Sequence, residues 1–99
     1  MLESIYEKCF CYELEQRNIS FEKQKTARLQ YDKLVIDEGL RIDILVDKQV
    51  VVELKAQDYY HSVWEAQLLS YLKLSNNRLG LIINFNVPLM KEGIKRMVL

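Results

Sequence analysis

Two neighbouring apolar runs in this chain carry charged residues of the kind that bind divalent cations. Asp43 lies in the run 41–46, and Glu53 and Lys55 lie in the run 50–55. Runs of this composition are typical of buried strands, where an isolated carboxylate is costly unless it is paired, protonated or bound to a metal. These three residues are therefore the first candidates for a functional site.

The polar stretch 47–49 joins the two runs and predicts a β-hairpin with a three-residue loop. In that register Val46 pairs with Val50, and counting outwards places Asp43 opposite Glu53. A slip of one residue would mix apolar and charged side chains on each face, so the hydrophobic pattern argues against it. Directly opposed side chains have Cβ atoms about 4.5–5.5 Å apart, and like charges at that separation destabilise a sheet.

Spacing alone leaves two interpretations of the acids open. In the first, the two carboxylates share a hard cation such as Mg²⁺, which takes oxygen ligands from carboxylates, water and phosphate. In the second, the sheet face is partly open to water, and Arg41 and Lys55 neutralise Asp43 and Glu53 as ordinary ion pairs.

Hydrophobic periodicity predicts the elements that must position these residues. In chain order they are a helix over 2–17, strands over 19–31, 34–46 and 49–56, a helix over 60–74, a strand over 79–85, and a helix or irregular tail over 89–98. The first three strands predict an antiparallel meander with a bend near Gly39, and Asn18 suits the left-handed end of a helix. The nearly all-apolar strand 79–85 is typical of a central position. The fold class is therefore mixed α/β, with a four-stranded sheet flanked by helices.

Side-chain periodicity assigns residues to faces of these elements. Ile42 and Ile44 are predicted to share one face of their strand. Gln67 and Tyr71 lie four residues apart and share one face of the helix 60–74. If that face packs on the sheet, Gln67 is a buried amide that needs hydrogen-bond partners. A core hydrogen bond and an active-site role explain it equally well.

Length and composition fit one domain over residues 1–99. The 14 basic and 14 acidic side chains give a formal net charge of zero, so no overall field attracts nucleic acid and any such binding must be local. Cys9 and Cys11 fit neither a redox nor a zinc motif and are predicted to be free thiols. No apolar run approaches the roughly 18 residues of a membrane span, and no signal-peptide pattern opens the chain, so we expect a cytoplasmic protein.

This order of elements and charged residues resembles the PD-(D/E)XK nuclease superfamily. Asp43 followed by Glu53-Leu-Lys55 fits the signature of an acid on one strand and an acid-x-Lys on the next, and residues 67–71 resemble the Gln-x-x-x-Tyr element of exonuclease-like branches. The resemblance implies a restriction-endonuclease-like αβββαβ core.

More narrowly, the chain resembles the small bacterial proteins of the GxxExxY family. Glu3 and Tyr6 match the Glu-x-x-Tyr part of that name, and residues 65–74 and 80–89 match two later blocks. The glycine of the name would precede the first residue, so the resemblance implies a further N-terminal segment that this sequence lacks. Trp64 stands where relatives often have His.

The resemblance implies a role in phosphodiester hydrolysis for eight residues. The ligands of Mg²⁺ or Mn²⁺ would be the carboxylates of Asp43 and Glu53, the Leu54 backbone carbonyl, and Glu3 from the first helix. Lys55 would orient or deprotonate the attacking water, and Gln67 would position that water or a phosphate oxygen. Arg41 and Tyr71 would support these groups.

Two functions are compatible with these observations. The first is a metal-dependent nuclease acting on DNA or RNA, which the intact set of site residues favours. The second is a catalytically silent nuclease-fold module acting in binding or assembly, which the neutral charge and small size favour. A chain of this size has little surface for phosphate contacts, so we expect it to need a homodimer or a protein partner to hold a duplex.

Overall fold

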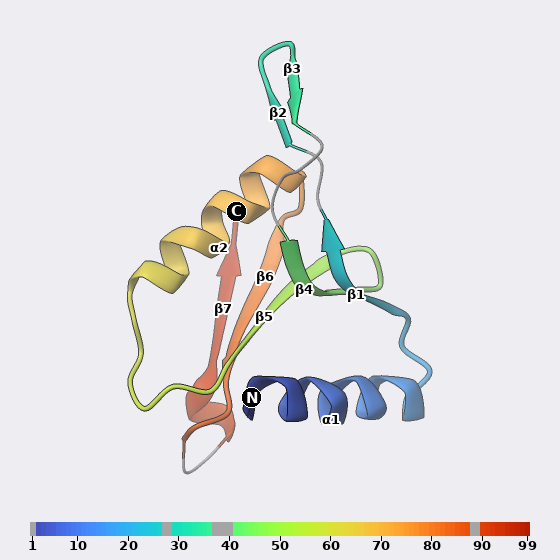
Figure 1. Cartoon of the computed structure of the whole chain (residues 1–99), viewed down its shortest axis with the longest axis vertical. Helices are drawn as coiled ribbons and strands as arrows, with labels where there is room; N and C mark the ends of the chain where they lie inside the picture. The colour runs from blue at the N-terminus through green and yellow to red at the C-terminus, as the bar shows by residue number, and fades with distance from the viewer. Residues whose placement is uncertain (1, 27–28, 37–40, 88–89) are drawn as a thin grey trace.

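The protein combines helices and strands in one mixed sheet, as predicted (Figure 1). The computed structural model describes residues 2–26, 29–36, 41–87 and 90–99. The elements are α1 (Leu2–Gln16), β1 (Phe21–Thr26), β2 (Leu29–Tyr31), β3 (Leu34–Ile36), β4 (Arg41–Val46), β5 (Val50–Lys55), α2 (Val63–Ser75), β6 (Leu79–Asn84), the 3₁₀ helix η1 (Met90–Gly93) and β7 (Ile94–Val98). No helix in the described ranges combines the length and apolar character needed to cross a bilayer.

The main sheet has five strands in the order β1-β4-β5-β6-β7. The strands β5 and β6 run parallel, with α2 between them in the chain, and every other neighbouring pair in this sheet is antiparallel. Parallel neighbours require such a crossover connection, which explains the position of α2. The strands β2 and β3 form a separate two-stranded sheet that projects beyond the main one (Figure 1).

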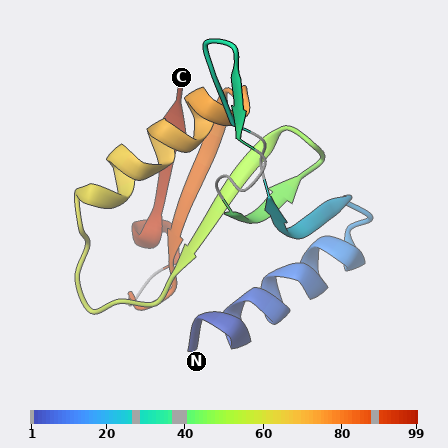
Figure 2. The same cartoon turned by 45° about the horizontal axis from the view of Figure 1, so that its top comes forward.

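The two helices bury different faces of this sheet, and Figure 2 shows the strands between them. Apolar side chains on the α2 side form one cluster, made of Ile42, Leu45, Val51, Trp64, Leu68, Leu72 and Ile82. On the α1 side a second cluster is made of Cys11, Leu14, Ile44, Val52, Leu54 and Ile83. Gly80 allows α2 to approach β6 closely, because an added Cβ would lie 2.9 Å from Leu68 Cδ1.

Several predicted features are confirmed. The pairs Val46–Val50 and Ile44–Val52 establish the predicted hairpin register, and β1, β4 and β5 form an antiparallel meander. Asn18 follows α1 with a left-handed φ of 57°. Both cysteines are free thiols.

The predicted strands 19–31 and 34–46 are wrong as single strands, because each contributes one strand to the main sheet and one to the small hairpin. The main ladder ends where Thr26 pairs with Arg41, and a second ladder begins at Leu29 and Ile36. Residues 22–26 are all polar and residues 34–36 are all apolar, so regular alternation does not mark the break. The bend predicted near Gly39 lies outside the described residues.

The predicted helix or irregular tail over 89–98 is also wrong in its second half. Residues 94–98 form β7, which pairs with the free edge of β6 and raises the sheet from the predicted four strands to five. Met97 packs against the cluster under α2, while Ile94 and Val98 are largely exposed. Such a short, half-exposed strand has little hydrophobic signal of its own.

Candidate metal and catalytic site

The site begins where β4 separates from its neighbours. The β4–β5 ladder ends at the pair Ile44–Val52, and Asp43 and Glu53 lie one position beyond it. On the other side of β4, the β1–β4 ladder omits Gln24, the residue that would face Asp43, and Gln24 has a positive φ of 51°. The local distortion of the sheet therefore leaves the Asp43 side chain free to turn towards β5.

The same distortion overturns the predicted face of Ile42. Simple alternation places it with Ile44, but Ile42 packs in the cluster under α2 together with Leu45, whereas Ile44 packs on the α1 side. A change of face within a strand is expected where regular pairing is lost, because the pleat is then no longer held by the neighbouring ladder.

Asp43 is held by the backbone of β5. The Leu54 N–H donates a hydrogen bond of 3.0 Å to Asp43 Oδ2, and the Asp43 side chain is half-buried. A backbone donor of this kind fixes the carboxylate beside the strand that carries Glu53 and Lys55. The two acids therefore lie close together, as predicted. Their proximity depends on the hydrogen bond of the Asp43 side chain, because the β4–β5 ladder does not continue to this pair.

Glu53 contributes a buried oxygen without a partner. Its Oε1 is inaccessible to solvent and receives no hydrogen bond. Burial, the negative charge of Asp43 and a hydrogen bond with Asp43 together raise the pKa of Glu53 from 4.5 to about 8. The Glu53 side chain therefore holds its proton more tightly than an exposed glutamate does. A proton shared between the two groups, or a cation in its place, would satisfy the oxygen.

Lys55 and Tyr71 border this pair. The Lys55 Nζ lies 5.4 Å from the centroid of the Trp64 ring, a cation–π distance, and Lys55 lowers the pKa of Glu53 by its charge. Burial, followed by the charges of Glu53 and Asp43, raises the pKa of Tyr71. The strands β4 and β5 and the helix α2 thus bring Asp43, Glu53, Lys55 and Tyr71 to one place.

The other predicted site residues, Gln67, Glu3 and Arg41, lie at the surface and not among these half-buried side chains. Gln67 is exposed, which corrects the expectation of a buried amide, because α2 turns Trp64, Leu68 and Leu72 to the sheet instead. Glu3 and Arg41 are also exposed. The described residues contain no group of three or more His, Cys, Asp or Glu side chains placed to hold an ion, so Glu3 does not join the two acids.

The interpretation of the acids as ordinary ion pairs is wrong for the described part of the chain. The ion pairs found there are Arg17–Glu13 and Lys25–Glu22, both on exposed surfaces. Neither Arg41 nor Lys55 forms an ion pair with the two acids.

The donor set fits a hard divalent cation. Two carboxylates from adjacent strands, one of them with an unpartnered buried oxygen, are the ligand type that Mg²⁺ and Mn²⁺ prefer. Strand residues direct their N–H and C=O to the same side, so the Leu54 carbonyl also faces the β4 side, where its N–H meets Asp43.

Sequence reasoning missed Asn84, whose side chain is 4 % exposed and organises the end of the site strand. Its Oδ1 accepts hydrogen bonds from the backbone N–H groups of Gln57 and Asn86, and its Nδ2 donates to the Gln57 carbonyl, at 3.1–3.2 Å. This amide joins the loop after β5 to the end of β6. A polar residue closing a nearly all-apolar strand is the signal that could have found it.

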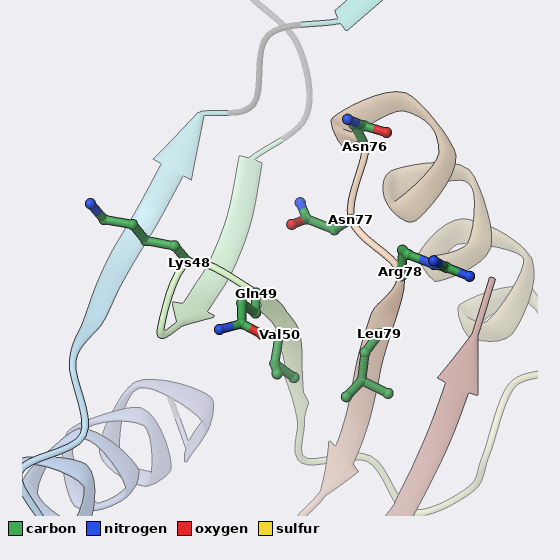
Figure 3. A pocket seen from close by; sticks show the side chains of 7 residues that line it. All are labelled: Lys48, Gln49, Val50, Asn76, Asn77, Arg78 and Leu79. Atoms are coloured by element: carbon green, nitrogen blue, oxygen red, sulfur yellow. The ribbon is translucent and has the colours of Figure 1, made fainter.

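A separate pocket of about 320 Å³ lies at the other end of β5 and β6, around Val50 and Leu79 (Figure 3). Its two cationic residues, Lys48 and Arg78, point away from one another, and no acid lines it. It therefore lacks the convergent groups found around Asp43 and Glu53, which lie towards the opposite end of the sheet.

The structure places Asp43 of β4 beside Glu53 and Lys55 of β5. The family model of the PD-(D/E)XK nuclease superfamily matches residues 1–97. The chain belongs to the PD-(D/E)XK nuclease superfamily. Neither a curated protein nor a solved structure matches it.

Proposed function

We propose that this PD-(D/E)XK domain is a metal-dependent nuclease that hydrolyses phosphodiester bonds of DNA or RNA. The observation that carries the proposal is the half-buried Glu53 side chain, which interacts with Asp43 and has one buried oxygen, Oε1, without a hydrogen-bond partner. A purely structural strand would gain stability by replacing Glu53 with an apolar residue, because a buried unpaired acid destabilises the fold. Its presence is accounted for if the oxygen binds a cation.

Mg²⁺ or Mn²⁺ would be held by Asp43, Glu53 and the Leu54 carbonyl. Bound there, the ion would supply Lewis-acid chemistry, lowering the pKa of a coordinated water and neutralising charge on the phosphate. The Leu54 N–H keeps the Asp43 carboxylate in place for this purpose. Ionisation of Glu53 accompanies cation binding, because the cation takes the place of its proton.

Lys55 is the proposed positioning and proton-transfer group. The Trp64 ring limits where its ammonium can lie, 5.4 Å from the ring centroid, and directs it along the α2 side of the sheet. From there the ammonium would orient the attacking water, and the deprotonated amine would accept a proton from it. Tyr71 borders the two acids and would support them, and Gln67, one turn earlier on α2, would reach a water or phosphate oxygen from the solvent side.

Roles for Glu3 and Arg41 stay predictions. Both side chains are exposed, so each can contribute only by reaching the substrate or the ion from the surface. We further propose that the chain is one nuclease domain of the GxxExxY type and acts in a bacterial cytoplasm. Its neutral charge suggests that it holds a duplex only as a homodimer or with a protein partner.

Calorimetric titration with Mn²⁺ tests the proposal, using wild type, Asp43→Asn and the control Asp47→Asn. Asp47 is exposed, lies in the turn at the other end of β5, and has a φ of 51° that Asn accepts. Wild type and Asp47→Asn should bind Mn²⁺ at millimolar concentrations, and Asp43→Asn should not. Absence of binding by wild type would remove the basis of the proposal.

Cleavage of labelled single-stranded and duplex DNA and RNA, with Mn²⁺ or with EDTA, then tests the activity itself. Asp43→Asn should lower the cleavage rate by about 10²-fold or more, because the metal contributes several kcal/mol to transition-state stabilisation. Mn²⁺ binding without cleavage of any substrate would instead favour the silent nuclease-fold module.

A further inference from the structure

Four aromatic side chains form a cluster between the end of β5 and the first turn of α2. This aromatic cluster consists of Tyr59, Tyr60, His61 and Trp64. The Tyr59–His61 ring centroids are 4.6 Å apart, those of His61 and Trp64 5.7 Å, and those of Tyr60 and Trp64 5.1 Å, all with edge-to-face geometry. Such contacts hold rings at defined angles to one another.

The cluster is anchored at one ring and open at the others. Trp64 is 7 % exposed and packs under α2, whereas Tyr59 is 62 % and Tyr60 43 % exposed, and His61 is exposed as well. Tyr59 contacts the cluster only through His61. Its large apolar surface therefore adds little to the stability of the fold and remains available to a ligand.

The loop that carries these rings is held by other contacts. Asn84 binds the backbone of Gln57 with two hydrogen bonds, and Asn86 Nδ2 donates to Asp58 Oδ1 at 2.6 Å. These bonds fix the start of the loop, and the buried Trp64 fixes its end. The loop is therefore held in place by other contacts and does not depend on burying Tyr59, Tyr60 and His61, which stay exposed.

The cluster adjoins the candidate catalytic site. Trp64 contacts the rings of Tyr60 and His61 and also lies 5.4 Å from the Lys55 ammonium. Lys55 is the last residue of β5, two positions after Glu53, and the loop with the rings follows it directly. A nucleic acid whose phosphate lies at the carboxylate pair would thus have neighbouring bases within reach of the rings.

Charge around the cluster offers little attraction to the phosphates of a single strand or of a duplex. Asp58 and Glu65 flank it, Lys55 is the adjacent cation, and the chain as a whole is neutral. Burial, followed by the hydrogen bond that the Tyr60 hydroxyl donates to Glu65, raises the pKa of Tyr60 to about 12. Ring stacking, which is indifferent to net charge, is the main attraction this surface can offer.

We propose that the aromatic cluster is a stacking surface for unpaired bases, so that the substrate class is single-stranded nucleic acid. The inference rests on the proposed function for its ligand, a nucleic acid. Bases within a duplex are already stacked and cannot present their faces to Tyr59 or Tyr60, whereas bases of a single strand can.

Binding of a labelled oligothymidine to the whole chain in EDTA tests this inference without cleavage. Fluorescence anisotropy gives the affinity, and emission of Trp64, the single tryptophan of the chain, reports whether the ligand reaches the cluster. Tyr59→Ala should weaken binding about tenfold, because one base–aromatic stack has about that effect, and Tyr59→Phe should bind like wild type. Tyr12→Ala is the matched control, since Tyr12 is 58 % exposed on α1 and far from α2.

Three results would overturn the inference: no binding of the oligothymidine by wild type, equal affinities of Tyr59→Ala and Tyr12→Ala, or tighter binding of a duplex that is insensitive to Tyr59. Thermal unfolding of each variant shows that it is folded before binding is compared. Tyr59-dependent binding in EDTA without any cleavage in Mn²⁺ would contradict the proposed nuclease activity and leave the stacking surface established.

Discussion

The backbone N–H of Leu54 donates a 3.0 Å hydrogen bond to Oδ2 of Asp43, and this bond joins the two strands of the site beyond the end of their ladder. It gives the Asp43 carboxylate a fixed position although its own strand is locally distorted. Burial, and then the charge of the neighbouring Asp43, raise the pKa of Glu53. Several measurable consequences follow from this arrangement.

Substitution Asp43→Asn should lower the pKa of Glu53. The charge of Asp43 and its hydrogen bond with Glu53 both raise that pKa, so their removal leaves burial as the main cause of the shift. An Asn side-chain oxygen can still accept the bond from Leu54, so the fold should be kept. NMR titration of the Glu53 carboxyl carbon in both proteins measures the effect, and an unchanged midpoint would contradict the coupling.

Stability should fall as pH rises between about 4.5 and about 8. Glu53 ionises at 4.5 in the unfolded chain but at about 8 in the folded protein, so the folded state holds the extra proton within this window. The free energy of unfolding then decreases with pH, and the contribution present below 4.5 is lost above 8. Urea unfolding across the window should show a smaller decrease for Glu53→Gln.

Glu22→Gln is the control for this pH dependence. Glu22 is exposed, and its hydrogen bond with Lys25 lowers its pKa below 4.5, so its own titration lies outside the window. The variant should follow the wild-type curve between 4.5 and 8. Equal pH dependence of wild type and Glu53→Gln would mean that Glu53 does not hold the proton.

Lys55→Met should separate catalysis from metal binding. Lys55 donates no ligand oxygen, so Mn²⁺ affinity should be kept or increased when this positive charge is removed. The cleavage rate should fall by about 10²- to 10⁴-fold, the usual contribution of a proton-transfer group. Lys95→Met, on the edge strand β7, is the control and should cleave like wild type. Loss of Mn²⁺ binding in Lys55→Met would assign the lysine a structural role instead.

Asn84→Ala should destabilise the protein by about 2 kcal/mol. The variant leaves the part-buried N–H and C=O groups of Gln57 without their side-chain partner, and the loss of such hydrogen bonds costs about 1–3 kcal/mol. The exposed Asn86→Ala, which removes a hydrogen bond at the surface, should cost clearly less. Urea unfolding compares the two, and equal losses would show that the Asn84 hydrogen bonds have no special weight.

The sequence was sufficient to predict the hairpin that carries the site. Its three-residue loop and the alternation of apolar side chains fix the register, and the pairs Val46–Val50 and Ile44–Val52 agree with it. Local patterns of this kind are strong because a slip of one residue reverses the faces of a whole strand. The order of the two helices and of β4, β5 and β6 followed from the same reasoning.

Other features depend on contacts that no local pattern encodes. Gln67 would be buried only if its face of α2 packed on the sheet, and the sheet instead contacts the face with Trp64, Leu68 and Leu72. β7 forms because β6 offers a free edge. The Glu53 oxygen lacks a partner because of where the β4–β5 ladder ends. That point depends on β1, β4 and β5 together.

The strand β5 lies at the centre of the sheet, so its amide hydrogens should exchange at rates very different from those of the exposed loop that follows it. Residues Val51 and Val52 are fully buried between β4 and β6, so their amides should exchange only through the largest opening events of the protein. The exposed loop at Tyr59 and Tyr60 should exchange through small local openings. Glu53 and Lys55, which are proposed for chemistry, thus lie on the strand expected to exchange most slowly, and Tyr59 and Tyr60, which are proposed for recognition, lie on the exposed loop that follows it.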